Sequence, residues 1–454
     1  MPAATAFIAL YSKMSDVLEK KALFYCTCVP FFVFFGIFSF FIFPNTQYLH
    51  PSLESVQALI PGGAETGGLA ILANIISNWT SALFYIISEI YSSVSVGILF
   101  WQFANDVVPV DQAKRMYPLF AQMSGLAPVL AGQYVVRFAS QAKDFETSLD
   151  RLMMAVLFAG AGICLFYHLA TSYIERTEGP VKVAGESSNN NQPKKAKKPK
   201  MSMSESAKFL ASSQYLRLIA TLVLGYGLSI NFTEIMWKSL VKKQYPNPLD
   251  YQRFMGNFSS AVGLATCIVI FFGVHVIRIL GWRIGACATP GIMAVLSAPF
   301  FACILMGLES PARLRTAVIL GTIQSLLSKT SKYALFDPTT QMAYIPLDDD
   351  SKVKGKAAID VLGSRIGKSG GSFIQQGLVF MFGSIIDAAP VVGVIFYSVL
   401  FSWIAAASKL SVLFQAQRRY FQPYIHPCLQ DRILILLQSL IQFLERIRDI
   451  FEEN

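Results

Sequence analysis

Long apolar segments recur along most of the chain and constrain its fold more than any other feature. We find eleven of them, at 2–13, 22–44, 74–103, 117–140, 151–174, 215–240, 251–277, 284–307, 312–336, 358–386 and 390–408. All but the first approach or exceed the roughly 20 residues that a helix needs to cross a bilayer. Because lipid offers the backbone no hydrogen-bond partner, such segments cross it as helices. The sequence therefore predicts an all-α membrane protein.

Composition and charge limit the class of protein further. Of 454 residues, 54% are hydrophobic and only 15% are charged, which excludes a soluble globular protein of this size. Much of the formal net charge of +10 lies in one hydrophilic segment, so it indicates topology and anionic partners and not a nucleic-acid-binding domain. The seven cysteines and four histidines show no disulfide or metal-ligand spacing, and we predict no metal and no other cofactor.

A polar, basic segment divides the chain. Residues 177–206 contain Ser, Asn and Pro together with the run PKKAKKPK, a composition typical of a disordered linker. We therefore expect an N-terminal helical bundle at 1–176, the linker at 177–206, a six-helix bundle at 207–410 and a tail at 411–454. Apolar residues at helical spacing in the tail predict an amphipathic helix at the membrane interface.

A loose internal repeat predicts how many helices belong to each half. FANDVVPVDQAKRMYP in the first half and FDPTTQMAYIPLDDDSKVKGK in the second both place Pro-x-Asp before basic residues. Matching them makes 74–103 the fourth helix of its half, so we expect a first helix upstream of this sequence and 11 of 12 transmembrane helices present, as in carriers with two repeated halves. Lys and Arg gather in the loops on the linker side, which predicts that this side lies inside.

Two acidic residues interrupt apolar segments. Glu89 lies in SALFYIISEIYSSVSVGILFW and Glu234 in TLVLGYGLSINFTEIMWKSL. An ionised side chain at the centre of the bilayer costs roughly 2.5–3.5 kcal/mol on insertion scales, so it is rare without a use. Asn231 lies three residues before Glu234 and Lys238 lies four residues after it, so all three share one face of a helix, which favours a water-filled path through a transporter. The alternatives are a polar pair within a helix interface and a proton-binding site.

Basic residues occupy two later apolar segments. Lys329 and Lys332 lie three residues apart on one face of a predicted helix, so we expect an anion or an acidic partner beside them. Arg365 and Lys368 lie in GSRIGKSGG, which is one residue too short for a P-loop and leads into an apolar span. An ATPase is therefore disfavoured, but these cations could still hold phosphate. An interhelical Glu–Lys pair without substrate contact, or helix packing through the glycines, explains the same residues. The residues indicate an anion carrier without naming the anion.

Several motifs together resemble a known family. They are IALYSKMSDVLEKKALFY, FYIISEIYSSVSVGILFWQFAND, YGLSINFTEIMWKSLVKKQYP, SLLSKTSKYALFDP and MAYIPLDDDSKVKGKAAIDVLGSRIGKSGG, and they occur in order over about residues 2–410. In these motifs the sequence resembles the non-mitochondrial ATP/ADP translocases of plastids and intracellular parasites, a family of nucleotide transporters. The similarity is greatest to diatom plastid nucleotide transporters.

The resemblance implies twelve helices in a major-facilitator-like fold of two bundles and a transporter of nucleotides that is not an enzyme. It matches Glu89, Glu234 and Lys368 to charges on which transport in that family depends, and Asn231 to the polar position beside the second. Gln341 replaces a glutamate that is common in ATP/ADP exchangers, which favours a broader range of nucleoside and deoxynucleoside triphosphates. The family's first helix, with an important lysine, is absent from this sequence. The resemblance also implies the plastid inner envelope.

We therefore predict a nucleotide antiporter that works by alternating access. The basic residues predicted to contact phosphate are Lys329, Lys332, Arg365 and Lys368. The aromatic residues predicted to stack on the base are Tyr85, Phe232 or Trp237. The partners would be ATP, ADP and other nucleotides together with the lipid bilayer, and no nucleic acid. Three alternatives stay open, namely a strict exchanger of ATP for ADP and phosphate, a proton-coupled carrier of another organic anion, and a relative that does not transport.

Overall fold

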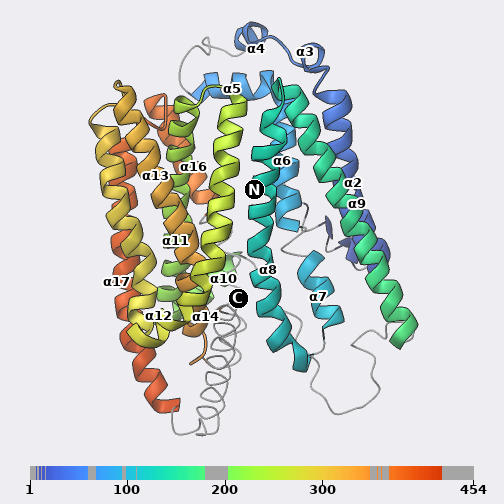
Figure 1. The fold of residues 1–454 in the computed structure, drawn as a ribbon. Coiled ribbons are helices and arrows are strands. Elements are labelled where there is room, and N and C mark those ends of the chain that lie inside the picture. The colour runs from blue at the N-terminus through green and yellow to red at the C-terminus, as the bar shows by residue number, and fades with distance from the viewer. Residues whose placement is uncertain are drawn as a thin grey trace, which may run out of the picture.

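The computed structural model describes residues 7, 10, 11, 13–15, 17–59, 68–94, 99–108, 110–178, 203–347, 355, 359 and 368–421. Every regular element in these ranges is a helix, and most of the helices run roughly parallel in two groups that lie side by side (Figure 1). The prediction of an all-α membrane fold is confirmed by these helices and by their apolar spans.

The N-terminal group comprises the helices before the linker. They are α2 (Lys20–Ile37), the π-helix η1 (Phe38–Ile42), α3 (Thr46–Leu49), α4 (Leu53–Leu59), α5 (Gly68–Ser77), α6 (Trp79–Val94), α7 (Trp101–Val107), α8 (Val110–Arg137), the 3-10 helix η3 (Ala139–Gln141) and α9 (Phe145–Glu178). The carboxylate of Asp144 accepts a hydrogen bond from the backbone N–H of Thr147 at 2.7 Å, which helps to set where α9 begins.

The C-terminal group comprises the helices after the linker. They are α10 (Met203–Ser212), α11 (Gln214–Gln244), α12 (Pro248–Leu305), α13 (Pro311–Ser331), the π-helix η4 (Lys332–Phe336), α14 (Asp337–Ala343), α16 (Lys368–Phe382) and α17 (Ala389–Phe421). Gly281 divides α12 into two helices, because its φ of 83° breaks the helical path at a conformation that favours glycine. The two spans expected at 251–277 and 284–307 lie on either side of this break.

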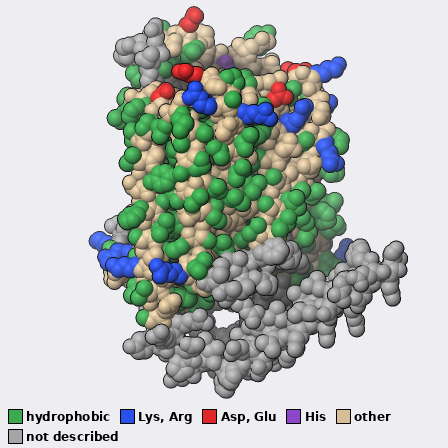
Figure 2. Space-filling model, turned by 60° about the vertical axis from the view of Figure 1, so that its left-hand side comes forward, with side chains coloured by type: hydrophobic (Ala, Val, Ile, Leu, Met, Phe, Trp, Pro, Cys, Tyr) green, Lys and Arg blue, Asp and Glu red, His purple; other side chains and the backbone are tan. Residues whose placement is uncertain are grey.

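Six helical stretches in the described residues are long and apolar enough to cross a membrane. They are Lys20–Ile42, Phe145–Arg176, Gln214–Gln244, Pro248–Ile270, Gly281–Leu305 and Ala389–Ala416. On the face shown in Figure 2, hydrophobic side chains fill the middle, and charged side chains lie toward the upper edge and the lower left. An apolar belt bordered by charges is the surface that a bilayer requires.

The structure divides one expected span into separate helices. We expected a single span at 74–103, but α5 ends at Ser77 and α6 begins at Trp79. The junction is tied to the preceding loop, because Trp79 Nε1 donates to the carbonyl of Leu49 at 3.0 Å and Ser77 Oγ donates to that of Pro51 at 2.8 Å. As a result, α5 lies across the top of the molecule in Figure 1, whereas α6 runs downward.

The last helix is longer than expected. α17 passes through the predicted bundle boundary at 410 and ends at Phe421. Packing explains the extension, since the ring of Phe414 stacks on that of Trp282 with centroids 5.1 Å apart. The rest of the predicted tail, 422–454, and most of the predicted linker lie outside the described residues.

Buried apolar side chains form two main clusters, one within each helical group. The groups meet along α8 and α12, where glycines bring the two backbones together. A Cβ on Gly132 would overlap the carbonyl oxygen of Gly256, and a Cβ on Gly263 would lie 2.9 Å from the carbonyl oxygen of Gly125. Small residues allow this close approach of helices within a membrane.

Among the described residues, hydrogen bonds between the two helical groups lie toward one end of the bundle, where α9 begins. Ser148 Oγ donates to Gln252 Oε1 at 2.7 Å, and Arg253 Nη2 donates to the carbonyl of Ser140 at 3.2 Å. Two further bonds join α8 to Ser260 of α12 nearby. Because α9 begins at this end and runs toward the linker, these bonds join the groups on the side away from the linker.

Candidate functional site

A cluster of three charged side chains lies on one face of α11. Oε1 of Glu234 is 2.9 Å from Nζ of Lys238, one turn further along the helix, and 3.1 Å from Nζ of Lys329 on α13. The side chains of Glu234, Lys238 and Lys329 are 24%, 43% and 26% exposed, so a ligand can reach all three. The neighbouring helices therefore present one carboxylate shared by two cations.

A second ion pair lies where α13 changes its winding. Lys332 opens the π-helix η4, and its Nζ atom lies 2.7 Å from Oδ2 of Asp337. Residues five apart lie on different faces of an α-helix, but a π-helix bonds residue i to i+5 and brings them into line. Pro338 accounts for the interruption, because it lacks the N–H that an unbroken α-helix needs. Lys329 and Lys332 thus both have acidic partners, which is one of the two alternatives that we expected, an anion being the other.

Aromatic rings border both ion pairs. Nζ of Lys329 lies 5.5 Å from the ring centroid of Phe258. Nζ of Lys332 lies 4.4 Å from the centroid of Tyr333 and 5.7 Å from that of Tyr226 on α11. Ring faces attract cations, most strongly where water is scarce. These rings therefore help to stabilise the lysines within the membrane-spanning part of the protein.

Asn231 connects the charge cluster to α16. Its backbone carbonyl accepts a hydrogen bond from Gln375 Nε2 at 3.1 Å. A Cβ on Gly371 would lie 3.3 Å from Cγ of Asn231, so the glycine permits α16 to come this close. Lys368 begins α16 one turn earlier, which places its backbone near α11. The side chain of Lys368 and the whole of Arg365 lie outside the described residues.

The helix α6 carries the two predicted site residues of the N-terminal group. Phe84 and Tyr91 pack on the core of that group, and Tyr85 and Glu89 lie on the other side of the helix, one turn apart. Tyr85 is 70% exposed and is an electrostatic neighbour of Lys238. Glu89 is partly exposed, and none of the ion pairs between described residues includes it. The polar face of α6 is thus directed toward α11.

Burial excludes two of the residues predicted to stack on a base. Phe232 and Trp237 are both fully buried in the C-terminal cluster, so neither ring has a face open to a ligand. Trp237 Nε1 also donates to Oγ1 of Thr322 at 3.0 Å, which ties the ring to α13. The interpretation of these two aromatics as base contacts is therefore wrong, and of the three only Tyr85 is exposed.

Sequence reasoning placed Lys238 on the polar face with Glu234 but not among the phosphate contacts, and it left Asp337 and Tyr226 out of the site. Lys238 had a clear signal, since it follows Glu234 by four residues on the same helical face. Tyr226 lies two turns before Glu234 and was open to the same reasoning. The pairing of Asp337 with Lys332 depends on the π-helix, and a five-residue spacing gives no such signal in an α-helix.

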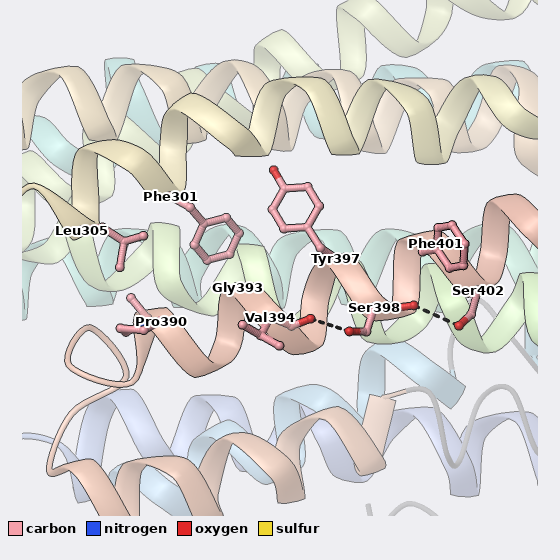
Figure 3. Close-up of a pocket in the computed structure, with 10 residues that line it drawn as sticks. Phe301, Leu305, Pro390, Gly393, Val394, Tyr397, Ser398, Phe401 and Ser402 are labelled. Atoms are coloured by element: carbon pink, nitrogen blue, oxygen red, sulfur yellow. Dashed lines mark hydrogen bonds between the residues drawn. The ribbon is translucent and has the colours of Figure 1, made fainter.

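An apolar surface groove lies apart from these charges. It measures about 680 Å³, lies between the second part of α12 and α17, and is lined by apolar residues such as Phe301 together with Tyr397 (Figure 3). The hydroxyls of Ser398 and Ser402 donate to the carbonyls of Val394 and Ser398 at 2.8 and 2.9 Å. Because these hydroxyls are satisfied within the helix, the groove suits an apolar environment and not an anion.

Comparison with known proteins decides the family. The model of the family described as TLC ATP/ADP transporter matches residues 1–414, which is most of the chain. The chain belongs to this family. Members of the TLC ATP/ADP transporter family are transporters and not enzymes, so the resemblance seen in the sequence is confirmed and the ATPase interpretation is excluded.

Individual relatives agree with the TLC assignment. The chain is 40% identical over 433 residues to "ADP,ATP carrier protein 1, chloroplastic" of Arabidopsis thaliana, which covers 92% of this chain and 67% of the relative. It is also 40% identical over 437 residues to "ADP,ATP carrier protein 1" of Chlamydia trachomatis, covering 92% and 80%. "ADP,ATP carrier protein 4" of Rickettsia bellii is 37% identical over 404 residues, covering 84% and 75%. The chain thus spans about two thirds of the length of the Arabidopsis relative.

A solved structure also has some similarity to this TLC-family chain. It is a bacterial homologue of the iron transporter ferroportin in an outward-facing state, with a TM-score of 0.40 and 15% sequence identity. The match covers 92% of this chain and 96% of that one.

Proposed function

We propose that this protein is a nucleotide antiporter that exchanges its substrates by alternating access of the two helical groups. The observation that carries the proposal is the carboxylate of Glu234, which two lysines share on the face of α11 directed toward α6. Charges in membrane-spanning helices cost free energy, so they are rare unless they have a function such as binding a polar ligand. A phosphate chain can replace a carboxylate as the partner of the same ammonium groups.

Four basic residues would hold the phosphate chain, namely Lys329, Lys332, Arg365 and Lys368. Lys329 and Lys332 support this role because each is paired with one carboxylate among the described residues, and a polyanion can displace that carboxylate. Lys368 is supported by the contact between Gly371 and Asn231, which brings the start of α16 close to the charge cluster. Arg would fork onto two phosphate oxygens, whereas Lys would act as a point charge. Asn231 would add a polar contact and Tyr85 would stack on the base.

The acidic residues favour exchange over leak. In the empty carrier, Glu234 holds Lys329, so the cation does not cross the membrane unpaired. A bound nucleotide takes over this lysine and releases the carboxylate. Glu89 on α6 would act in the same way from the N-terminal group. Glu89, Glu234 and Lys368 are therefore the charges that we propose transport to require.

We further propose that the substrates include nucleoside and deoxynucleoside triphosphates and that the protein acts in the plastid inner envelope. Gln341 on α14 supports the broad range, because it is uncharged where the ATP/ADP exchangers that the sequence resembles commonly have glutamate. Relatives named as chloroplastic, at 40% identity, support the location.

Nucleotide exchange in proteoliposomes tests the proposed function. Vesicles that contain the purified protein and internal ATP should take up labelled ATP, and vesicles without internal nucleotide should take up much less. Competition by unlabelled nucleoside and deoxynucleoside triphosphates distinguishes a broad exchanger from a strict ATP/ADP exchanger. Uptake that follows an imposed pH gradient and ignores internal nucleotide would instead indicate a proton-coupled carrier of another anion.

Two variants connect this exchange to the charges. Glu234→Gln removes the carboxylate that pairs Lys329 in the empty carrier, and Lys368→Gln removes a proposed phosphate contact. Each variant loses one charge-assisted hydrogen bond, which contributes about 1.5–3 kcal/mol, so each should lower exchange at least about tenfold. Lys242→Gln is the control, because Lys242 is exposed near the end of α11 and has no ion pair with another described residue. Exchange at the wild-type rate in either charge variant would refute the assignment.

A further inference from the structure

Lys238 belongs to the charge cluster without being among the phosphate partners proposed so far. Its Nζ atom and that of Lys329 both contact Oε1 of Glu234, at 2.9 and 3.1 Å. Two ammonium nitrogens that share one oxygen are separated by no more than about 6 Å, which oxygens of a single polyanion can bridge with charge-assisted hydrogen bonds. The two lysines are therefore already placed to bind one anion together.

Lys238 is the more accessible lysine of this pair and faces the other helical group. Its side chain is 43% exposed, compared with 26% for Lys329. Its electrostatic neighbours include Tyr251 on α12 and, from the N-terminal group, Tyr85 on α6. Lys238 thus lies where the two groups face each other, which is where a substrate handled by both groups must pass.

The carboxylate of Glu234 binds both lysines, but it is a weaker partner for them than a phosphate chain would be. One oxygen must accept from two ammonium groups, whereas a phosphate chain offers each lysine an oxygen of its own and carries more negative charge. The backbone is already fixed, because Met236 and Leu240 on the opposite side of α11 are fully buried. An anion can therefore replace the carboxylate through side-chain movement alone.

We propose that Lys238 is a substrate-binding residue that forms a two-cation clamp with Lys329. Glu234 fills the clamp in the empty carrier, and the phosphate chain of a nucleoside di- or triphosphate fills it in the loaded carrier. This inference rests on the proposed function and adds a phosphate contact on α11, one turn beyond Glu234. Removal of Lys238 leaves Glu234 paired with Lys329, so a neutral variant keeps the carboxylate satisfied and retains the fold.

Equilibrium binding of ATP and of ADP to the purified full-length protein tests the clamp. Lys238→Gln should weaken the binding of both nucleotides at least about tenfold, because it removes one charge-assisted hydrogen bond. Lys238→Arg keeps the charge and should stay closer to wild type. Lys242→Gln, on the same helix, should bind as the wild type does. Thermal unfolding without nucleotide should show that all these proteins are folded.

A double-mutant cycle distinguishes direct contact from an effect through Glu234. If Lys238 binds phosphate, Lys238→Gln also weakens ATP binding when Glu234 is already replaced by Gln. If Lys238 merely positions Glu234, the effect disappears in that background. Disappearance of the effect, or binding by Lys238→Gln within about twofold of Lys242→Gln, would overturn the clamp but leave nucleotide exchange by the wild type intact. A wild-type protein that binds no nucleotide would overturn the proposed function and the clamp with it.

Discussion

Gly132 lies in the contact between α8 and α12, and its replacement by alanine measures how tightly that contact joins the two helical groups. An added Cβ would overlap the carbonyl oxygen of Gly256 and the hydroxyl of Ser260, and it would lie 3.0 Å from the backbone nitrogen of Ser260. Two of these three atoms belong to the backbone and cannot turn away. The alanine variant can therefore form only if α8 and α12 move apart.

Gly132→Ala should be about 2–4 kcal/mol less stable than a matched glycine-to-alanine variant. Overpacking a close contact costs about 1–3 kcal/mol. Ser260 also accepts a hydrogen bond from Gln133 at 3.1 Å and donates one to the carbonyl of Val129 at 3.3 Å, and separation of the helices weakens both. The control is Gly162→Ala on α9, where nothing lies within 4 Å of the added Cβ. Alanine there should gain about 0.5–1 kcal/mol from its helix propensity.

Thermal unfolding of both variants in the same lipid nanodisc gives the comparison. Gly125→Ala adds an intermediate case, because its Cβ would meet Sγ of Cys267 at 2.9 Å, and a side-chain end can move where a carbonyl cannot. We expect the lowest unfolding temperature for Gly132→Ala, an intermediate one for Gly125→Ala and the highest for Gly162→Ala. Equal unfolding temperatures for the first and the last would refute the close contact between α8 and α12.

Three further changes test other parts of the structure. Asp337→Asn should leave the protein folded, because the ion pair with Lys332 is partly exposed and contributes less than about 1 kcal/mol, but it should lower nucleotide exchange in proteoliposomes. Trp237→Phe removes the hydrogen bond that the buried indole donates to Thr322 and should lower stability by about 1–2 kcal/mol. Base preference in the competition assay should stay the same, since the ring is not exposed. In the double variant Ser148→Cys, Gln252→Cys, a short bifunctional thiol reagent should cross-link the two helical groups. Exchange should then stop, because the groups must separate at this end during transport. Each single cysteine variant treated with the same reagent should remain active.

The sequence predicted the helices and the charges better than it predicted their partners. Apolar length is a local property, so the expected spans at 117–140 and 151–174 correspond to α8 and α9. The break between Ser77 and Trp79 was not predictable in this way, because it depends on hydrogen bonds to the loop at 49–51. Helix boundaries that tertiary contacts decide leave little trace in a local pattern.

The site illustrates the same limit in side-chain contacts. Glu234 and Lys238 could be paired from a four-residue spacing alone, and helical geometry could also have excluded Phe232, which lies on the opposite side of α11 from the charged face. The partner of Lys332 could not be found, because only the local change from α- to π-helix aligns it with Asp337. The contact of Asn231 with α16 likewise depends on how two distant segments pack.

Two features fit the proposed exchange: the rigid core of the C-terminal helical group and the contact between the two groups, which is formed mainly by one helix from each. The cations of the clamp are carried on α11 and α13, and α11 is anchored by side chains such as Met236 and Leu240 that are fully buried. The N-terminal group faces the clamp through Tyr85 and meets the C-terminal group mainly along α8 and α12. When the nucleotide binds, the carboxylate of Glu234 is released from the lysines, and this side-chain movement requires no rearrangement of the apolar core of either helical group. Access to the clamp then depends on how the groups tilt about α8 and α12, and an anion that neutralises the lysines lowers the cost of that movement.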